Sequence, residues 1–414
     1  MAARRQVLQL SARAIEHCLN ADTSDYAGPH LPCSCGSSAR YVDRRRKTFQ
    51  SVLGELELER AYYHCSDCQQ GFFPRDHALG LENSSLSPAV TRMIGAVGAL
   101  VSFQEGSELM EELAGVSVEA KQVERVAERL GEEVAQHERA DLQPAEQAPP
   151  GTLYLGLDGT GIPLRASELL GRTGKQADGS AKTREVKLCT IWSAESRDSY
   201  GLPVRDEGSV TYSAAIESAA SPLACRSEFA DRVLREATRR RFPEAPRTVI
   251  IGDGAPWIWN IAQELFPRAI QIVDRFHAKE HLSIVAKAIY GPTDQRAQQW
   301  AKRRHAELDD GRFDALWKAL RRHASICEEA RKCLSYLQTN RSRMRYPEFQ
   351  AQGLSTSSGV VEAGCKTVIG TRLKRAGMHW TLRGSNAIIA LRCCRLSGRF
   401  EDFWERRSHR KAAA

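Results

Sequence analysis

Hydrophobic and polar positions follow two clear periodicities near the amino terminus of this chain of 414 residues. Residues 1–26 carry apolar side chains at helical spacing, which predicts one amphipathic helix. Residues 54–63 instead alternate strictly between polar and apolar side chains around Leu56 and Leu58. That alternation is typical of a strand with one buried face, so a helix followed by a hairpin is expected.

Helical periodicity continues from residue 87 to residue 137. Leu109 and Leu113 share one face of a first helix, and Gly115 then breaks the pattern. Ser117 is placed to cap a second helix. This is the layout of a helix-turn-helix, although any helical hairpin with a glycine turn has the same pattern. A DNA-reading motif and a plain helical pair therefore both remain open.

A Pro- and Gln-rich segment at 141–150 predicts a linker, and the pattern changes beyond it. Short β-branched runs predict strands, separated by two helical segments. The predicted strands are 152–164, 186–192, 209–212, 248–253 and 270–273, and the helices are 227–240 and 257–266. The order of three strands, helix, strand, helix and strand resembles the beginning of a ribonuclease H-like domain.

The periodicity between residues 278 and 349 is again helical, which predicts an all-helical insertion in an α/β core. The expected organisation has six parts. They are a helix with a zinc-ribbon-like module at 1–80, a helical module at 81–140, a linker at 141–150, the first part of the core at 151–277, a helical insertion at 278–350, and a last core helix with a basic tail at 351–414.

Positive charge is concentrated near the carboxyl terminus. The whole chain has 59 Lys and Arg against 51 Asp and Glu, a net charge of +8, whereas residues 366–411 contain 12 basic residues and 3 acidic ones. Such a block favours binding to a polyanion, most simply nucleic acid. A solvated charged tail is the alternative. Interleaved apolar residues such as Ile388 and Trp404 favour a folded basic surface.

The chain has no apolar run near the ~20 residues that a membrane span needs, and no secretory signal at its start. A soluble cytoplasmic protein that does not bind membranes is therefore expected. Four of the 12 cysteines form two close pairs, Cys33 with Cys35 and Cys65 with Cys68. In this compartment such pairs favour a structural Zn²⁺ site over disulfides, with free structural thiols as the alternative.

Three acids lie where an α/β sheet can bring them together. Asp158 falls inside the first core strand, Asp253 ends the fourth, and Glu362 follows the serine-rich segment 355–358, which should cap a helix. Carboxylates in this order suit two Mg²⁺ ions about 3.5–4 Å apart. Each acid also has a structural explanation, because Asp-Gly commonly ends a strand and Glu362 could pair with Lys366.

Four segments carry a resemblance to a known family. They are Leu157-Asp-Gly-Thr160, Ile251-Gly-Asp-Gly-Ala-Pro-Trp257, Val273-Asp-Arg-Phe-His277 and Gly359-Val-Val-Glu-Ala-Gly-Cys-Lys366. Together they resemble the catalytic blocks of bacterial insertion-sequence DDE transposases of the ISKra-type group, which is distantly related to Mutator-like transposases. The resemblance implies a ribonuclease H-like DDE core in which Asp158, Asp253 and Glu362 bind two Mg²⁺ ions, or Mn²⁺, with His277 beside them.

The same resemblance implies a nucleoid-associated bacterial enzyme that cuts DNA at the ends of its own element. It would join the freed ends to target DNA, acting on double-stranded DNA as a homodimer or higher oligomer. The candidate phosphate contacts are Lys366, Arg372, Lys374, Arg375 and Arg383. Two alternatives remain: a ribonuclease H-like nuclease without strand transfer, and a non-catalytic zinc-ribbon regulator that binds DNA.

Overall fold

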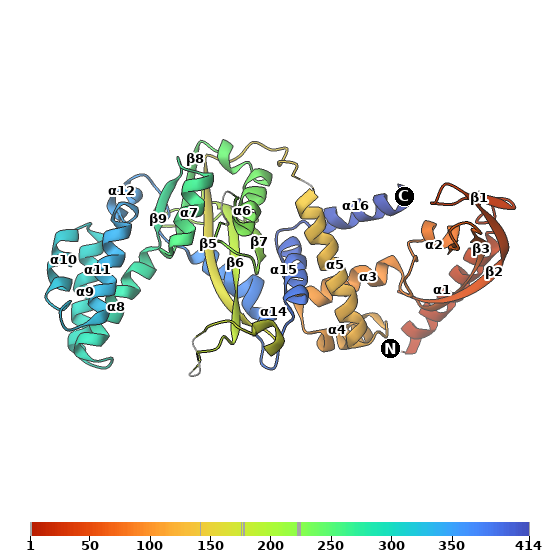
Figure 1. Ribbon diagram of the computed structural model, residues 1–414, viewed down its shortest axis with the longest axis horizontal. Helices are drawn as coiled ribbons and strands as arrows, with labels where there is room; N and C mark the ends of the chain where they lie inside the picture. Colours follow the sequence, from red (N-terminus) through yellow and green to blue (C-terminus); the bar gives the residue numbers. More distant parts are fainter. Residues whose placement is uncertain (1, 141, 175, 177–178, 222–224, 414) are drawn as a thin grey trace. The chain divides into compact units, whose positions relative to one another are not determined.

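The structure is a computed structural model, and its chain divides into two compact units (Figure 1). It describes residues 2–140, 142–174, 176, 179–221 and 225–413. The amino-terminal unit comprises Met1–Ala135 together with Gly398–Ala414, and the core unit comprises Gln136–Ser397. The predicted tail 351–414 is therefore divided at residue 398. Within the described residues, no helix combines the length and the apolar character that a membrane crossing requires.

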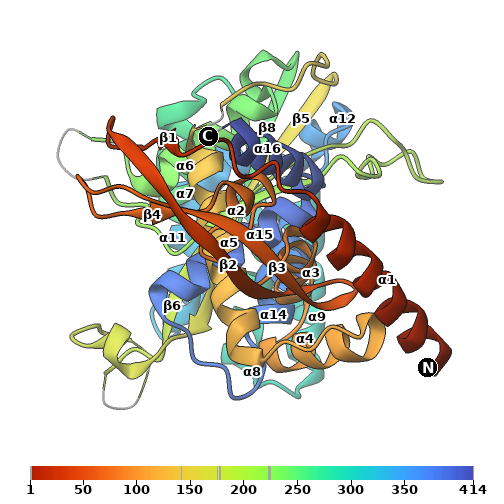
Figure 2. The same cartoon turned by 90° about the vertical axis from the view of Figure 1, so that its right-hand side faces the viewer.

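An antiparallel sheet of order β1-β2-β3-β4 forms one part of the amino-terminal unit. Its strands are β1 (His30–Pro32), β2 (Ser38–Ser51), β3 (Gly54–His64) and β4 (Gly71–Phe72). The long β2–β3 hairpin is visible in Figure 2. Leu56 and Leu58 are buried beneath α1 (Ala2–Ala21), as their alternation predicts. This helix ends earlier than predicted, because the Asp22 carboxylate accepts the Ser24 backbone N–H in a turn.

Helices make up the rest of the amino-terminal unit. They are α2 (Pro74–Ala78), α3 (Pro88–Leu100), α4 (Phe103–Leu109), α5 (Ala120–Ala140), which runs on into the core unit, and α16 (Phe400–Ala413). Gly115 has φ +70° and ends the first helix of the predicted pair. The predicted cap at Ser117 is wrong, since α5 starts at Ala120. The Ser107 hydroxyl instead donates to the Val118 carbonyl and holds the intervening segment outside the helix.

The last helix joins the amino-terminal unit through side chains that the carboxyl-terminal pattern did not reveal. Arg92 Nη2 of α3 lies 2.5 Å from Glu401 Oε1, and Arg407 of α16 pairs with Glu133 of α5. Phe400 packs where a side chain on Gly95 would otherwise lie. These contacts explain why α16 separates from the core helices that precede it.

A five-stranded mixed sheet of order β7-β6-β5-β8-β9 forms the centre of the core unit. The strands are β5 (Thr152–Pro163), β6 (Thr183–Ser193), β7 (Thr211–Ala215), β8 (Arg247–Gly252) and β9 (Ile270–Val273). β5, β6 and β7 are antiparallel neighbours, while β8 and β9 run parallel to β5. All five predicted strands are present. The third starts two residues late, because the Ser209 hydroxyl is bonded within the preceding turn.

Helices pack on this sheet from several parts of the chain. They are α6 (Glu228–Arg239), α7 (Pro256–Leu265), α13 (Gly359–Gly364), α14 (Thr371–Leu373) and α15 (Leu382–Leu396). Gly156 of β5 and Gly364 of α13 bring that short helix close to the sheet. A β-carbon on Gly156 would lie 2.9 Å from Val361, and one on Gly364 would lie 2.9 Å from Leu188.

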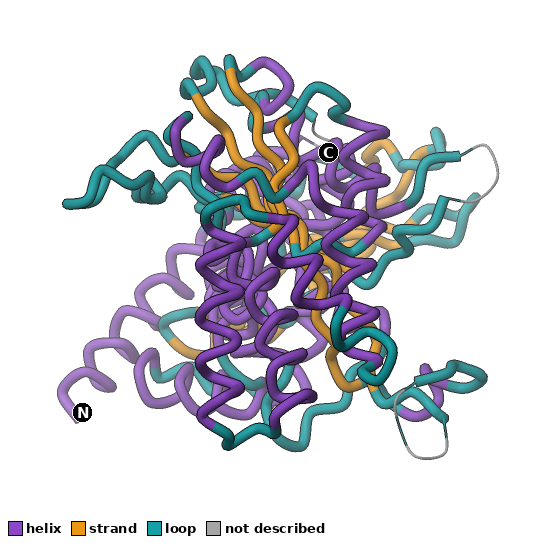
Figure 3. Tube along the Cα trace, turned by 90° about the vertical axis from the view of Figure 1, so that its left-hand side faces the viewer, coloured by secondary structure: helices purple, strands orange, loops and turns teal. Residues whose placement is uncertain are grey.

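The predicted helical insertion follows β9 directly and forms a bundle (Figure 3). It contains α8 (Arg275–Tyr290), α9 (Gln295–Asp309), α10 (Phe313–Arg321), α11 (Glu328–Asn340) and α12 (Tyr346–Ala351). Leu282, Leu308 and Leu337 belong to the same buried cluster as Leu155 and Ile250 of the sheet. The insertion and the sheet thus share one hydrophobic core.

Gly254 allows a contact between the insertion and the end of β8. Its φ is +102°, and Tyr336 Cε2 lies 2.5 Å from where a β-carbon would be. Gly291 has a similar φ of +95° but no neighbour within 4 Å of that position. Gly291→Ala should therefore lower the free energy of unfolding by about 1–3 kcal/mol, through backbone strain alone. Gly254→Ala should lower it by the same strain and by a further ~1–3 kcal/mol, because the new methyl group overlaps Tyr336. Urea unfolding of both variants measures the difference, and equal losses would contradict this assignment.

Candidate active site and metal centre

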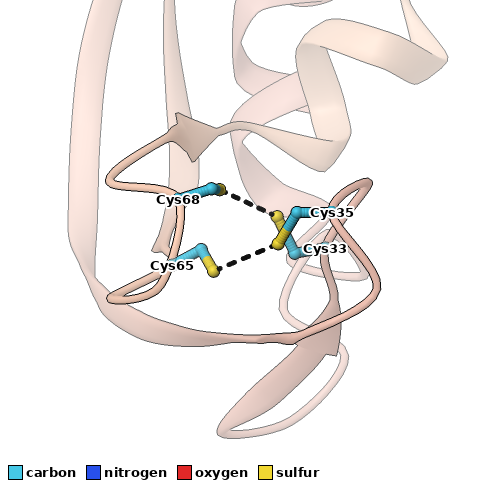
Figure 4. A group of neighbouring side chains, drawn as sticks. All are labelled: Cys33, Cys35, Cys65 and Cys68. Atoms are coloured by element: carbon cyan, nitrogen blue, oxygen red, sulfur yellow. Dashed lines mark hydrogen bonds between the residues drawn. The ribbon is translucent and has the colours of Figure 1, made fainter.

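Four cysteine sulfurs meet between two turns of the amino-terminal sheet (Figure 4). Cys33 Sγ lies 3.6 Å from Cys68 Sγ, and Cys35 Sγ lies 3.7 Å from Cys65 Sγ. All four sulfurs are within 4.8 Å of one another. The two pairs that are close in sequence thus interleave in space.

Each turn places its cysteines with a left-handed residue immediately after the second sulfur. Gly36 has φ +88° and Gln69 has φ +58°. The Cys33 backbone N–H donates to the Ser37 carbonyl at 2.8 Å and closes the first turn. The single residue between Cys33 and Cys35 is therefore accommodated by a tight turn with glycine at its sharpest position.

The cluster has the dimensions of a tetrahedral zinc site. Zn–S bonds of about 2.3 Å place sulfurs about 3.8 Å apart in a regular tetrahedron, close to the observed separations. The Ser37 backbone N–H, aided by the neighbouring thiol of Cys33, lowers the pKa of Cys35 to about 6. Thiolates are the form that binds zinc. The four cysteines could thus hold one Zn²⁺, which would stabilise a small sheet.

Replacing Cys65 and Cys68 together by Ser should remove bound zinc and lower the melting temperature of the amino-terminal unit, because two of four thiolates are lost. Cys18→Ser is the matched control, since Cys18 is an exposed free thiol outside the cluster. Metal analysis of the purified proteins should find about one zinc per chain in the wild type and in the control. Zinc retained at that level by the double variant would refute the site.

Three acidic side chains are positioned by separate elements of the core unit. Asp158 lies on β5, and its carboxylate accepts the Gly159 backbone N–H at 2.6 Å. Asp253 follows β8 directly, and its carboxylate accepts the Ala255 N–H at 2.8 Å, which fixes the turn into α7. Glu362 lies on α13, which packs against β5 and β6.

His277 connects Glu362 to the start of the helical insertion. Its Nε2 lies 3.5 Å from Glu362 Oε1, and its backbone N–H donates to Asp274 at 2.7 Å. The buried Asp274 also accepts the Ser358 backbone N–H. The serines at 355–358 were expected to cap this helix; Ser358 occupies the N-cap position, but its side chain makes no capping hydrogen bond. Its hydroxyl donates to Glu362 Oε1 at 3.0 Å instead and fixes that carboxylate.

Electrostatic interactions show that these side chains share one neighbourhood. Burial raises the pKa of Asp158, and the negative charge of Asp253 raises it further. His277 and a hydrogen bond with Cys365 act in the opposite direction. Burial and Asp158 in turn raise the pKa of the Cys365 thiol. A carboxylate whose ionisation is disfavoured by a neighbouring carboxylate is stabilised by a cation, so the donor set fits hard divalent metals.

The donor atoms of the acidic group are less closely gathered than those of the cysteine cluster. Among the described residues, the cysteines alone form a group of three or more metal-binding side chains whose donor atoms all lie within 4.8 Å. The donor oxygens of Asp158, Asp253 and Glu362 do not meet this limit.

Two residues beside Asp253 were not predicted from the sequence. The Tyr336 hydroxyl of α11 donates to the Asp253 carbonyl at 2.8 Å, and its ring centroid lies 4.1 Å from that of His281. Burial raises the pKa of Tyr336 and lowers that of His281. Periodicity could not reveal either contact, because Tyr336 on α11 and His281 on α8 meet only after the insertion has folded back.

The predicted phosphate contacts separate into exposed and buried residues. Lys366, Lys374, Arg375 and Arg383 are exposed, and the Lys374 ammonium donates to the Thr160 hydroxyl, two residues beyond Asp158. The prediction that Arg372 contacts phosphate is wrong. This side chain is fully buried, and its guanidinium lies 5.1 Å from the centroid of the Trp380 ring, so it stabilises the core rather than facing DNA.

The fold and the two sites define an α/β protein with a separate four-cysteine module. The model of an uncharacterised protein family, UPF0236, matches residues 232–408, a segment that contains Asp253, His277 and Glu362. The chain is also similar to a Streptococcus gallolyticus protein described as "UPF0236 protein in vanSb 3'region". The two are 21% identical over 374 residues, which cover 88% of this chain and 75% of that protein.

Proposed function

We propose that the protein is a DDE transposase that cuts DNA at the ends of its own mobile element and joins them to target DNA. The observation that carries the proposal is the convergence of Asp158, Asp253 and Glu362 at one end of the core sheet. The strand order, with three antiparallel strands and two strands parallel to the first, supports a ribonuclease H-like core. The sequence blocks that resemble insertion-sequence transposases contain the same three acids.

The three carboxylates would hold two Mg²⁺ ions, or Mn²⁺. Such ions activate the attacking oxygen and stabilise the leaving oxygen of a phosphodiester. His277 is close to Glu362, so its imidazole would donate a hydrogen bond to a non-bridging oxygen of the scissile phosphate. Two hydrogen bonds hold Asp253 in position: the Tyr336 hydroxyl donates to its backbone carbonyl, and the Ala255 N–H donates to its carboxylate.

Basic and zinc-binding surfaces would supply the DNA contacts. Lys374 is bonded to Thr160 close to Asp158, so it would meet a phosphate near the cut. The other exposed basic residues, Lys366, Arg375 and Arg383, would extend this contact along the strand. The cysteine module and the helical pair would bind the element ends. Two copies of the chain would bring the two ends together.

Asp253→Asn and Glu362→Gln should each lower DNA cleavage by more than about 10²-fold. Mutation of a residue that only hydrogen-bonds to a metal ligand lowers metal affinity or activity about 10–100-fold, and mutation of a direct ligand should lower activity more. Cleavage is measured in Mg²⁺ on a plasmid that carries the reading frame with its flanking DNA. Glu264→Gln is the control, because Glu264 is an exposed acid on α7, the helix that follows Asp253. Wild-type cleavage by either acid variant would refute the metal-binding assignment.

Strand transfer is tested separately with pre-cut duplexes that end in a 3′-hydroxyl, mixed with a target plasmid. Joined products should appear with the wild type and disappear with the two acid variants. Cleavage without any joined product would show a nuclease that does not transpose. DNA binding that is retained while the wild type neither cuts nor joins would show a DNA-binding regulator.

A further inference from the structure

A cavity of about 820 Å³ lies in the core unit. It is bounded by the start of β6, the segment that follows β7 and the first turns of α7. Its polar and aromatic lining includes Arg172, Arg184, Lys187, Ser218, Trp257 and Asn260. None of these side chains is used by the three carboxylates.

The cavity and the carboxylates share one end of the sheet. Lys187 is paired across β5 and β6 with Gly159, the residue after Asp158. Trp257 lies four residues beyond Asp253, in the first turn of α7. Neighbouring side chains on a strand point to opposite faces, so Lys187 and the cavity lie on the face covered by α7, whereas Leu188, the partner of Asp158, packs against Gly364 of α13. A strand of nucleic acid whose phosphate reached Asp158 would therefore reach the cavity by passing round this end of the sheet.

The charges on the wall favour an anion. The two acids of the lining already have partners: Glu185 pairs with Lys187, and Glu217 accepts two hydrogen bonds from Arg232 at 2.6 and 2.8 Å. Arg172 and Arg184 have no ion pair within the described part of the chain. Burial and the like charge of Arg172 lower the pKa of Arg184, whereas the negative charge of Glu168 acts in the opposite direction. Two neighbouring guanidinium groups that make no direct ion pair are suited to a phosphate.

A fixed aromatic ring faces the same space. Trp257 is partly exposed, and it packs edge-on against the buried Phe229, with ring centroids 5.7 Å apart and planes at 75°. The Lys187 ammonium lies 5.5 Å from its centroid. Asn260, three residues further along α7, is exposed. An indole held in this way offers a stacking surface for a base, and the amide offers hydrogen bonds to the base edge.

We propose that this cavity binds one unpaired nucleotide of the DNA strand that enters the acidic site. Arg172 and Arg184 hold its phosphate, and Trp257 stacks on its base. The volume suits a ligand of nucleotide size and is too small for a duplex. This inference rests on the proposed function, since it requires the strand that is cut to reach the cavity as well.

The test uses the full-length protein in Ca²⁺, which prevents cleavage, with a short fluorescein-labelled oligothymidylate as the probe. Trp257→Leu should weaken binding about tenfold, because one stacked base is lost. Trp257→Phe should restore most of the affinity, because it retains an aromatic face. Equal affinity of the wild type and Trp257→Leu would overturn the proposal.

The phosphate contacts are tested through the salt dependence of the same binding. Arg172→Gln and Arg184→Gln should each lower the slope of log affinity against log salt by about 0.7, as expected for one lost contact to a single strand. Arg268→Gln is the matched control, because Arg268 is exposed just beyond the far end of α7. An unchanged slope in both cavity variants would overturn the assignment of the arginines.

Failure of this inference is distinguishable from failure of the proposed function. If the cavity variants bind the probe like the wild type while Asp253→Asn abolishes cleavage in Mg²⁺, the transposase assignment stands and the cavity assignment falls. If the wild type neither binds the probe nor cleaves DNA, both fall. If the cavity variants bind the probe weakly while Asp253→Asn binds it normally, the cavity assignment is supported, because the cavity then binds the strand without help from Asp253.

Discussion

The buried carboxylate of Asp274 is the constraint on which the acidic site depends. It accepts the backbone N–H of His277, in the first turn of α8, and that of Ser358, which precedes α13. Burial of a carboxylate is unfavourable in free energy unless hydrogen bonds replace those lost to water. Burial of Asp274 therefore requires both N–H donors, and this holds the two segments together. The segments are about eighty residues apart in sequence. Their junction brings His277 to Glu362 and sets the last acid beside the first two.

The acidic site also requires helices to approach the strand ends closely, and glycines allow this because they have no side chain. Gly156 and Gly364 let α13 approach β5 and β6, and Gly254 admits Tyr336 to the turn after β8. Each acid is therefore held by a neighbouring element as well as by its own. Asp253, for example, is fixed by its bond to the Ala255 N–H and by Tyr336 from the insertion. Preorganisation of this kind is what metal-dependent phosphoryl transfer demands of a protein.

The two units are stabilised by different interactions. The core unit has one large hydrophobic cluster that runs from the sheet into the helical insertion. The cysteine end of the amino-terminal sheet has only a small buried cluster around Ala39, Ala61 and Tyr63. A metal held by four thiolates would supply the cohesion that so small a cluster lacks. The two units would then owe their stability to different interactions.

The sequence by itself determined the features that depend on local periodicity and spacing. The five core strands, the helical insertion, the cysteine pairs and the order of the three acids all follow from side chains close together in the chain. Only the tertiary structure decided that Arg372 is buried against Trp380, that Tyr336 bonds to Asp253 and that α16 joins the amino-terminal unit. Burial of a charge and the reach of one helix to a distant strand depend on contacts between remote segments. No local pattern encodes those contacts, because a basic helix has the same sequence signature whether it faces solvent or the core.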